Sequence, residues 1–230
     1  MADTTNTQPI PSVVFGSSIG PMEGHLRRVY NATDNELEYL KKLLDLRTKK
    51  RPPLSPERSG YGSPSIVIDD FLYHGDANQA SNISLLTHLN IRHIVSVCDY
   101  SLEKPITDKC NVLWINLPDE MGANVKQHFD QTNRFLFECK TKNEKVLVHC
   151  QMGISRSSSI ILAYLMKYHH DTLYKAYNYL LERRRIAAPN LSFFLQLIRY
   201  ESELRATREI DETKNIDDQQ NPIKTLDANN

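Results

Sequence analysis

The residues most suited to chemistry lie in one short stretch of the chain. Cys150 and Arg156 follow the apolar run KVLVH and enclose a loop that contains Gly153. A loop that leads into a helix leaves backbone N–H groups without partners, and the helix dipole makes that point attractive to anions. Arg156 adds a planar fork that matches two oxygens of a phosphate. The sequence therefore predicts a site for a phosphate dianion.

Cys150 stands at the rim of this expected anion site. The field that attracts a phosphate also favours the thiolate, which is the nucleophilic form of cysteine. The thiolate can attack a phosphorus atom held by the loop, and Ser157 can donate a hydrogen bond to the sulfur when it leaves. We expect the loop residues to bind the phosphate and the preceding histidine to orient the loop: Gln151, Met152, Gly153, Ile154, Ser155 and Arg156, with His149 as support.

The leaving oxygen of a phosphoester needs a proton, which a carboxylic acid can supply. Asp119 is the candidate general acid because it ends an expected strand, and its carboxylate can later deprotonate the hydrolytic water. Glu120 is a rival supported only by its neighbouring position. An aspartate in a strand-end turn is also common without any catalytic role. The Cys, Gly and Arg at fixed offsets after an apolar strand nevertheless favour a functional site over a simple fold junction.

Strand-like and helical segments alternate along the chain. This order predicts an α/β fold with a central, mostly parallel sheet flanked by helices, and a phosphate loop between the central strand and a buried helix. Ligands of such sheets bind at the carboxyl ends of the strands, where Cys98, Asp119 and Cys150 are expected. Strands are expected within 65–75 and over 91–98, 110–119 and 145–150, and helices over 77–90, 123–142, 158–170, 171–185 and 188–206.

The 230 residues are expected to form one domain with appended segments. Thr33 and Glu36 have the spacing of a capping box, which predicts a helix after residue 32. Polar stretches without period predict disorder at both ends. The resulting division is a disordered tail over 1–32, an isolated helix over 33–50, a linker over 51–63, a catalytic domain over 64–206 and a disordered tail over 207–230.

Composition narrows the function classes. The formal net charge is zero, which gives no reason to expect binding to nucleic acid or to an anionic membrane. No apolar run is long enough to span a membrane, and the first residues lack the pattern of a secretory signal, so a cytoplasmic or nuclear location is expected. The four cysteines have no CxxC spacing, so no metal site is expected.

The segment VLVHCQMGISRSSSIILAYLM resembles the signature of the dual-specificity branch of the cysteine-dependent protein tyrosine phosphatases. The likeness extends from about Ser65 to Leu204. It implies that Cys150 is the nucleophile, Arg156 the phosphate clamp, Ser157 the hydroxyl that assists the leaving thiolate and Asp119 the general acid. It also implies hydrolysis of phosphotyrosine and phosphoserine/threonine in proteins without metal or cofactor. Kinase phosphatases and slingshot-like cofilin phosphatases are about equally similar, which makes a protein kinase or a cofilin-like protein an expected partner.

Three alternatives stay open from the sequence. The chain could be a phosphoprotein-binding adaptor without turnover, although the intact Cys150, Arg156 and Asp119 speak against it. It could also hydrolyse a phosphoester that is not a protein, such as a lipid, RNA or glucan phosphate. Cys98 could trap an oxidised Cys150 as a disulfide, or it could be an ordinary core cysteine.

Overall fold

The computed structural model describes residues 19–50 and 62–220, with side chains described as far as residue 210. In these ranges the strands form one sheet in the order β1-β2-β5-β3-β4. β1 pairs with β2 in antiparallel fashion, and the other neighbours are parallel, so the expectation of a mostly parallel sheet is confirmed. The strands are β1 (Ser65–Ile68), β2 (Leu72–Gly75), β3 (Ile91–Val97), β4 (Asn111–Ile115) and β5 (Lys145–His149).

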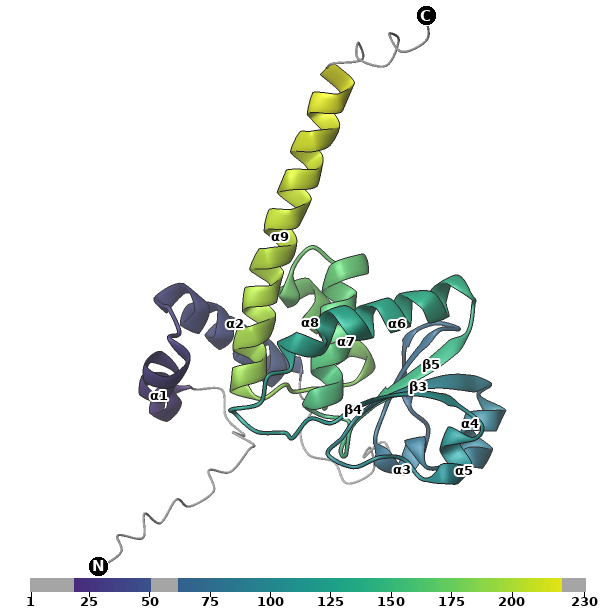
Figure 1. Ribbon diagram of the computed structural model, residues 1–230. Coiled ribbons are helices and arrows are strands. Elements are labelled where there is room, and N and C mark those ends of the chain that lie inside the picture. The colour runs from purple at the N-terminus through teal and green to yellow at the C-terminus, as the bar shows by residue number, and fades with distance from the viewer. Residues whose placement is uncertain (1–18, 51–61, 221–230) are drawn as a thin grey trace, which may run out of the picture.

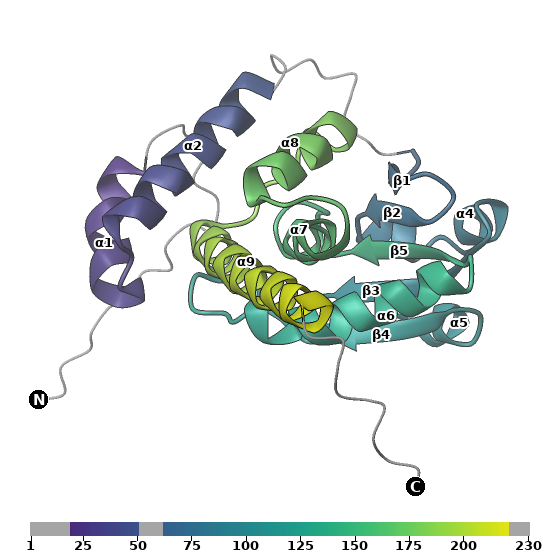
Figure 2. The same cartoon turned by 90° about the horizontal axis from the view of Figure 1, so that it is seen from above.

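Helices cover both faces of the sheet (Figures 1 and 2). Alternate residues of β5 face opposite sides, so Val146 and Val148 join the large core under α7, while Leu147 joins a smaller core with α4 and α5. The helices of the smaller layer are α3 (Ala77–Ala80), α4 (Ile83–His88) and α5 (Lys104–Thr107). The larger layer holds α6 (Phe129–Thr141), preceded by the 3₁₀ turn η2 (Lys126–His128), and α7 (Arg156–Tyr168), α8 (Leu173–Arg183) and α9 (Leu191–Gln220).

The segment before the catalytic region is helical where we expected a disordered tail. Helix α1 (Gly20–Tyr30) has Pro at its start, and it buries Leu26 completely, as well as the preceding Ile19. The prediction of disorder for 1–32 is therefore wrong over this helix. Its apolar side chains are too sparse to show a helical period, but a few of them are enough to hold a helix when they pack against a neighbouring surface. Residues 1–18 lie outside the described part of the chain.

Helix α2 (Asp34–Lys50) is not isolated, which corrects the second expectation. The capping box is present, since the Glu36 N–H donates to Thr33 Oγ1 over 3.3 Å and the Thr33 N–H donates to Glu36 Oε2 over 2.8 Å. Polar contacts join α2 to α9, with Arg199 Nε 2.7 Å from Glu36 Oε1 and the Tyr39 hydroxyl 2.8 Å from Glu201 Oε2. The apolar face of α2 packs into the large core through its buried leucines, Leu37, Leu40, Leu43, Leu44 and Leu46.

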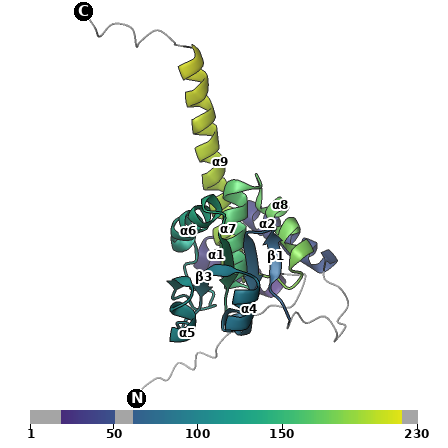
Figure 3. The ribbon, with the colours of Figure 1, turned by 90° about the vertical axis from the view of Figure 1, so that its right-hand side faces the viewer.

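Helix α9 continues to Gln220, whereas the sequence predicted a disordered tail from residue 207. The second half projects away from the body of the molecule (Figure 3). The polar residues after 206 show no periodic pattern. Once the earlier, buried turns of α9 have formed, however, each further residue can join the helix at little cost in free energy. Most of the expected linker, residues 51–61, and the last residues, 221–230, lie outside the described residues. Among the helices that the structure describes, none is long and apolar enough to cross a membrane.

Candidate active site

The loop between β5 and α7 carries the predicted nucleophile and clamp. Cys150 follows the last residue of β5 directly, and α7 begins at Arg156. Gly153 adopts a φ of +61°, a left-handed conformation that favours glycine. A Cβ atom at this position would lie 2.5 Å from the carbonyl oxygen of Gly75 on β2. The loop therefore turns tightly against the sheet, and it needs a glycine to do so.

The carbonyl groups of the loop bind to neighbours outside it. The Gln151 carbonyl accepts from the Ala77 N–H over 3.2 Å, and the Ile154 carbonyl accepts from the Ala188 N–H over 2.8 Å. The Gly153 carbonyl accepts from Arg184 Nε over 2.7 Å. In a planar trans peptide the following N–H points the opposite way, so these bonds turn successive amides toward the inside of the loop. Inward-facing amides of this kind are the arrangement that an anion-binding nest requires.

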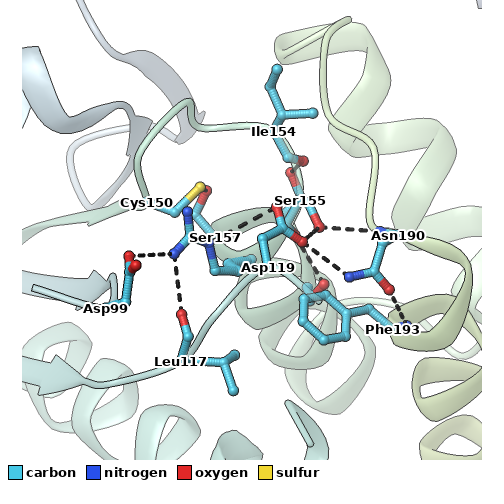
Figure 4. A network of polar contacts seen from close by, with 12 residues as sticks. Asp99, Leu117, Asp119, Cys150, Ile154, Ser155, Ser157, Asn190 and Phe193 are labelled. Carbon is cyan, nitrogen blue, oxygen red and sulfur yellow. Dashed lines mark hydrogen bonds and ion pairs between the residues drawn. The ribbon is translucent and has the colours of Figure 1, made fainter. Parts of the chain in front are cut away.

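The sulfur of Cys150 has a hydroxyl beside it. The Ser157 hydroxyl donates to Cys150 Sγ over 3.1 Å, and it also contacts Nε2 of His74 at 2.8 Å (Figure 4 shows the two labelled residues Cys150 and Ser157). All three side chains are buried. Burial lowers the pKa of His74 well below its ordinary value, and the charge of Arg184 and the nearby His149 act in the same direction. The ring beside Ser157 is therefore neutral.

Arg156 is held through one nitrogen of its guanidinium, and its buried Nε is left without a hydrogen-bond partner among the described residues. Its Nη1 donates to the Leu117 carbonyl over 3.1 Å and to Asp99 Oδ1 over 3.3 Å (Figure 4 labels the two acceptor residues). The side chain is buried, yet Nε has no hydrogen-bond partner among the described residues and lies 3.9 Å from Asp119 Oδ2. A buried donor without a partner is costly, and a phosphate oxygen would satisfy it.

Asp119 lies at the same end of the sheet. Its Oδ1 accepts hydrogen bonds from Ser155 Oγ over 2.7 Å and from Asn190 Nδ2 over 3.0 Å (Figure 4). The Asn190 side chain also caps α9, because its Oδ1 accepts from the Phe193 N–H over 2.9 Å. The rival Glu120 is exposed. The structure thus brings the carboxylate of Asp119 to the loop that holds the cysteine.

Cys98 follows β3, the strand next to β5, and is fully buried. Burial raises the pKa of its thiol, which a hydrogen bond with Tyr100 partly offsets. His149 is also buried, and burial lowers its pKa to about 4. In the loop itself Gln151 and Met152 are exposed, whereas Ile154 is half-buried and Ser155 is buried. The exposed side chains leave the mouth of the loop uncharged.

Three residues that support the site escaped the sequence analysis. His74, Arg184 and Asn190 come from segments distant from the loop, and all three are buried against it or against the acid. A Pro-Asn pair directly precedes the last helix, which is a usual signal for a helix start, and the Asn190 side chain caps that helix. Nothing in the sequence near His74 or Arg184 indicates their contacts, because those contacts depend on the pairing of β2 with β5 and on the packing of α8.

Comparison with known proteins agrees with this geometry. Residues 72–203 match the family described as the catalytic domain of dual specificity phosphatases. A dual specificity protein phosphatase of Arabidopsis thaliana is 35% identical over 61% of this chain and 71% of its own length. The chain spans 29% of a probable rhodanese domain-containing dual specificity phosphatase of Dictyostelium discoideum, at 38% identity over 61% of this chain.

Solved structures give the same result. Human DUSP28 matches with a TM-score of 0.58 and 26% identity, over 62% of this chain and 99% of its own. DUSP15 matches with a TM-score of 0.57 and 28% identity, over 65% of this chain and 96% of its own. The site geometry and the match over the catalytic region together lead to one conclusion: the chain belongs to the dual specificity phosphatase family.

Proposed function

We propose that this protein hydrolyses phosphotyrosine and phosphoserine/threonine in proteins through a phosphocysteine intermediate. The observation that carries the proposal is the convergence of Cys150, Arg156 and Asp119 at one end of the sheet, around a buried guanidinium Nε that lacks a partner among the described residues. The family membership supports the same reaction.

The reaction has two steps. In the first, the Cys150 thiolate attacks phosphorus, a P–S bond forms, the P–O bond to the substrate breaks and Asp119 donates a proton to the leaving oxygen. In the second, water attacks the phosphorus, Asp119 takes a proton from it, and the sulfur leaves as a thiolate that accepts the Ser157 hydrogen bond. Inward-facing amides and Arg156 stabilise the charge on the transferred phosphoryl group in both steps.

The uncharged side chains of the phosphate loop favour a phosphoprotein over a polyanionic substrate. Gln151, Met152 and Ile154 carry no charge, so a phosphoinositide with several phosphates gains nothing from the loop side chains beyond its single bound phosphate. Relatives named dual specificity protein phosphatase 5 and Slingshot homologue match at 38% and 34% identity, which supports a phosphorylated kinase or a cofilin-like protein as the substrate. A silent adaptor is the second candidate, and the three intact residues oppose it.

Turnover of an aryl phosphate and of a phosphoserine peptide tests the proposal. Cys150→Ser should abolish turnover, because an uncharged hydroxyl replaces the thiolate. Asp119→Asn should lower the rate by roughly 10²–10⁴, the usual contribution of a general acid, and more with the peptide, whose leaving group is poorer. Glu120→Gln is the matched control and should keep the wild-type rate. Wild-type turnover equal to that of Cys150→Ser would favour the adaptor instead.

A further inference from the structure

A chain of hydrogen bonds reaches the sulfur of Cys150 from the middle of the sheet. His74 lies in β2, and its Nε2 is 2.8 Å from the Ser157 hydroxyl in the first turn of α7. That hydroxyl is 3.1 Å from Cys150 Sγ. His74 and Ser157 are fully buried and Cys150 nearly so, which means that solvent does not compete for these bonds.

Two neighbouring serines show what the Ser157 hydroxyl would otherwise do. Ser158 and Ser159 are also buried, and each donates back to the carbonyl four residues earlier, that of Ile154 and that of Ser155. This is the usual bond for a serine inside a helix. Ser157 departs from the pattern, since its hydroxyl proton is directed at the cysteine sulfur.

The backbone carbonyl four residues before Ser157, which would be its usual helical acceptor, already accepts another hydrogen bond. Four residues earlier lies Gly153, whose carbonyl accepts from Arg184 Nε over 2.7 Å. Arg184 also donates to the His74 carbonyl over 3.3 Å, so one buried guanidinium ties the loop to β2. A carbonyl can accept two hydrogen bonds, as that of Ile154 does from the Ala188 N–H and the Ser158 hydroxyl, so Arg184 competes for the Gly153 carbonyl without excluding Ser157 from it. The Ser157 hydroxyl nevertheless donates to the sulfur, and the contact with His74 is what distinguishes it from Ser158 and Ser159.

The hydrogen positions follow from the chemistry of the three groups. A hydroxyl has a single proton, and here it goes to the sulfur, so Ser157 Oγ can only accept from His74. His74 must then carry its hydrogen on Nε2. The ring is neutral and has one N–H, and Nδ1 has no hydrogen-bond partner in the described part of the chain, so a hydrogen there would have no acceptor.

We propose that His74 is a positioning residue that fixes the Ser157 hydroxyl so that its proton stays directed at Cys150 Sγ. The inference rests on the proposed function and extends it by one residue. The bond matters most when the P–S bond of phosphocysteine breaks and the electron pair stays on sulfur, because the hydroxyl then stabilises the departing thiolate. No proton is transferred along the chain.

Pre-steady-state hydrolysis of an aryl phosphate tests this role. His74→Leu should slow phosphocysteine hydrolysis about tenfold, the value of one buried hydrogen bond of roughly 1.4 kcal/mol, and should produce a burst of the aryl alcohol because the first step is less affected. The pH midpoint for alkylation of Cys150 by iodoacetate should rise. His74→Gln, whose amide N–H can reach Ser157, should restore most of the rate. Ser159→Ala removes another buried hydroxyl of α7 and serves as the matched control.

A double-mutant cycle shows whether His74 acts through Ser157. With Ser157→Ala present, His74→Leu should have no further effect, whereas independent roles would make the two losses multiply. Multiplying losses, or a His74→Leu variant with wild-type burst and alkylation midpoint, would overturn the inference. If His74→Leu does not fold, His74→Asn, whose amide is too short to reach Ser157, decides in its place. If the wild-type protein shows no turnover that depends on Cys150, the proposed function itself is refuted instead.

Discussion

Replacement of Gly153 by alanine gives the most direct measure of how tightly the phosphate loop is built. An alanine would have to adopt the φ of +61°, which costs about 1–2 kcal/mol for a residue with a Cβ atom. Its methyl group would also lie 2.5 Å from the Gly75 carbonyl oxygen and close to the guanidinium of Arg184. Overpacking of this kind costs about 1–3 kcal/mol, so the free energy of unfolding should fall by about 2–5 kcal/mol in total.

The clash between the introduced methyl group and the Gly75 carbonyl cannot be relieved without moving the backbone. Arg184 could move, but Gly75 belongs to β2 and pairs in register with His149 of β5, so its carbonyl is fixed by the sheet. The loop must shift instead, and its amides then no longer converge on one point. We expect turnover of an aryl phosphate to fall at least about 100-fold, the scale of losing a preorganised donor, with a parallel loss of vanadate binding.

Urea unfolding, turnover and vanadate inhibition measure the three effects. Gly24→Ala is the matched control, because Gly24 lies inside α1 and a Cβ there would meet Arg28 only at an ordinary 3.7 Å. Alanine should raise helix stability at that site by about 0.5–1 kcal/mol and leave turnover unchanged. A Gly153→Ala protein that unfolds within 0.5 kcal/mol of the wild type and still binds vanadate would refute the reasoning, since about 2 kcal/mol is the least that the strain allows.

Two further predictions concern oxidation and pH. Hydrogen peroxide should oxidise the Cys150 thiolate to a sulfenic acid. The Cys98 thiol then attacks the sulfenic sulfur, the hydroxyl leaves as water and a Cys98–Cys150 disulfide forms, which peptide mapping should find; stable sulfinic acid at Cys150 would contradict this. Burial lowers the pKa of His149 to about 4. Because the unfolded chain takes up that proton near pH 6.5, His149 alone should lower the free energy of unfolding by about 1.4 kcal/mol per pH unit between roughly pH 6 and 4.5. Urea unfolding of His149→Asn should show a slope shallower by that amount, and equal slopes would contradict the assignment.

The central part of the fold was predictable because its determinants are local. The apolar run of β5, the turn at Gly153 and the buried pattern of α7 follow one another in the sequence, so each element could be assigned without its neighbours. The parallel order then placed the carboxyl ends of β3 and β5 together, so that Cys98 and Cys150 follow neighbouring strands at the same edge of the sheet. The division into α3 and α4 was missed, although Asn82 caps the second helix by accepting from the Leu85 N–H over 3.0 Å.

The helices at the two ends could not be predicted from periodicity. The α1 segment carries few apolar residues, and its burial depends on packing into the large core beside α2 (Figure 2). The later turns of α9 are polar and gain their order from the buried turns before them. A run of arginines at the end of α8 is typical of favourable charge at a helix C-terminus, yet Arg184 is buried and binds the Gly153 carbonyl. Its partners lie in β2 and in the loop, and only the tertiary structure brings them together.

Arg184 shows why these supporting contacts matter to the chemistry. A loop that binds a dianion must keep its carbonyl dipoles turned outward, and an outward carbonyl that is buried needs a donor of its own. The Gly153 carbonyl finds that donor in Arg184, just as the Ile154 carbonyl finds it in the Ala188 N–H. If such a donor were lost, the carbonyl could rotate inward and oppose the anion. The proposed anion site therefore depends as much on the groups behind the loop as on Cys150 and Arg156 within it.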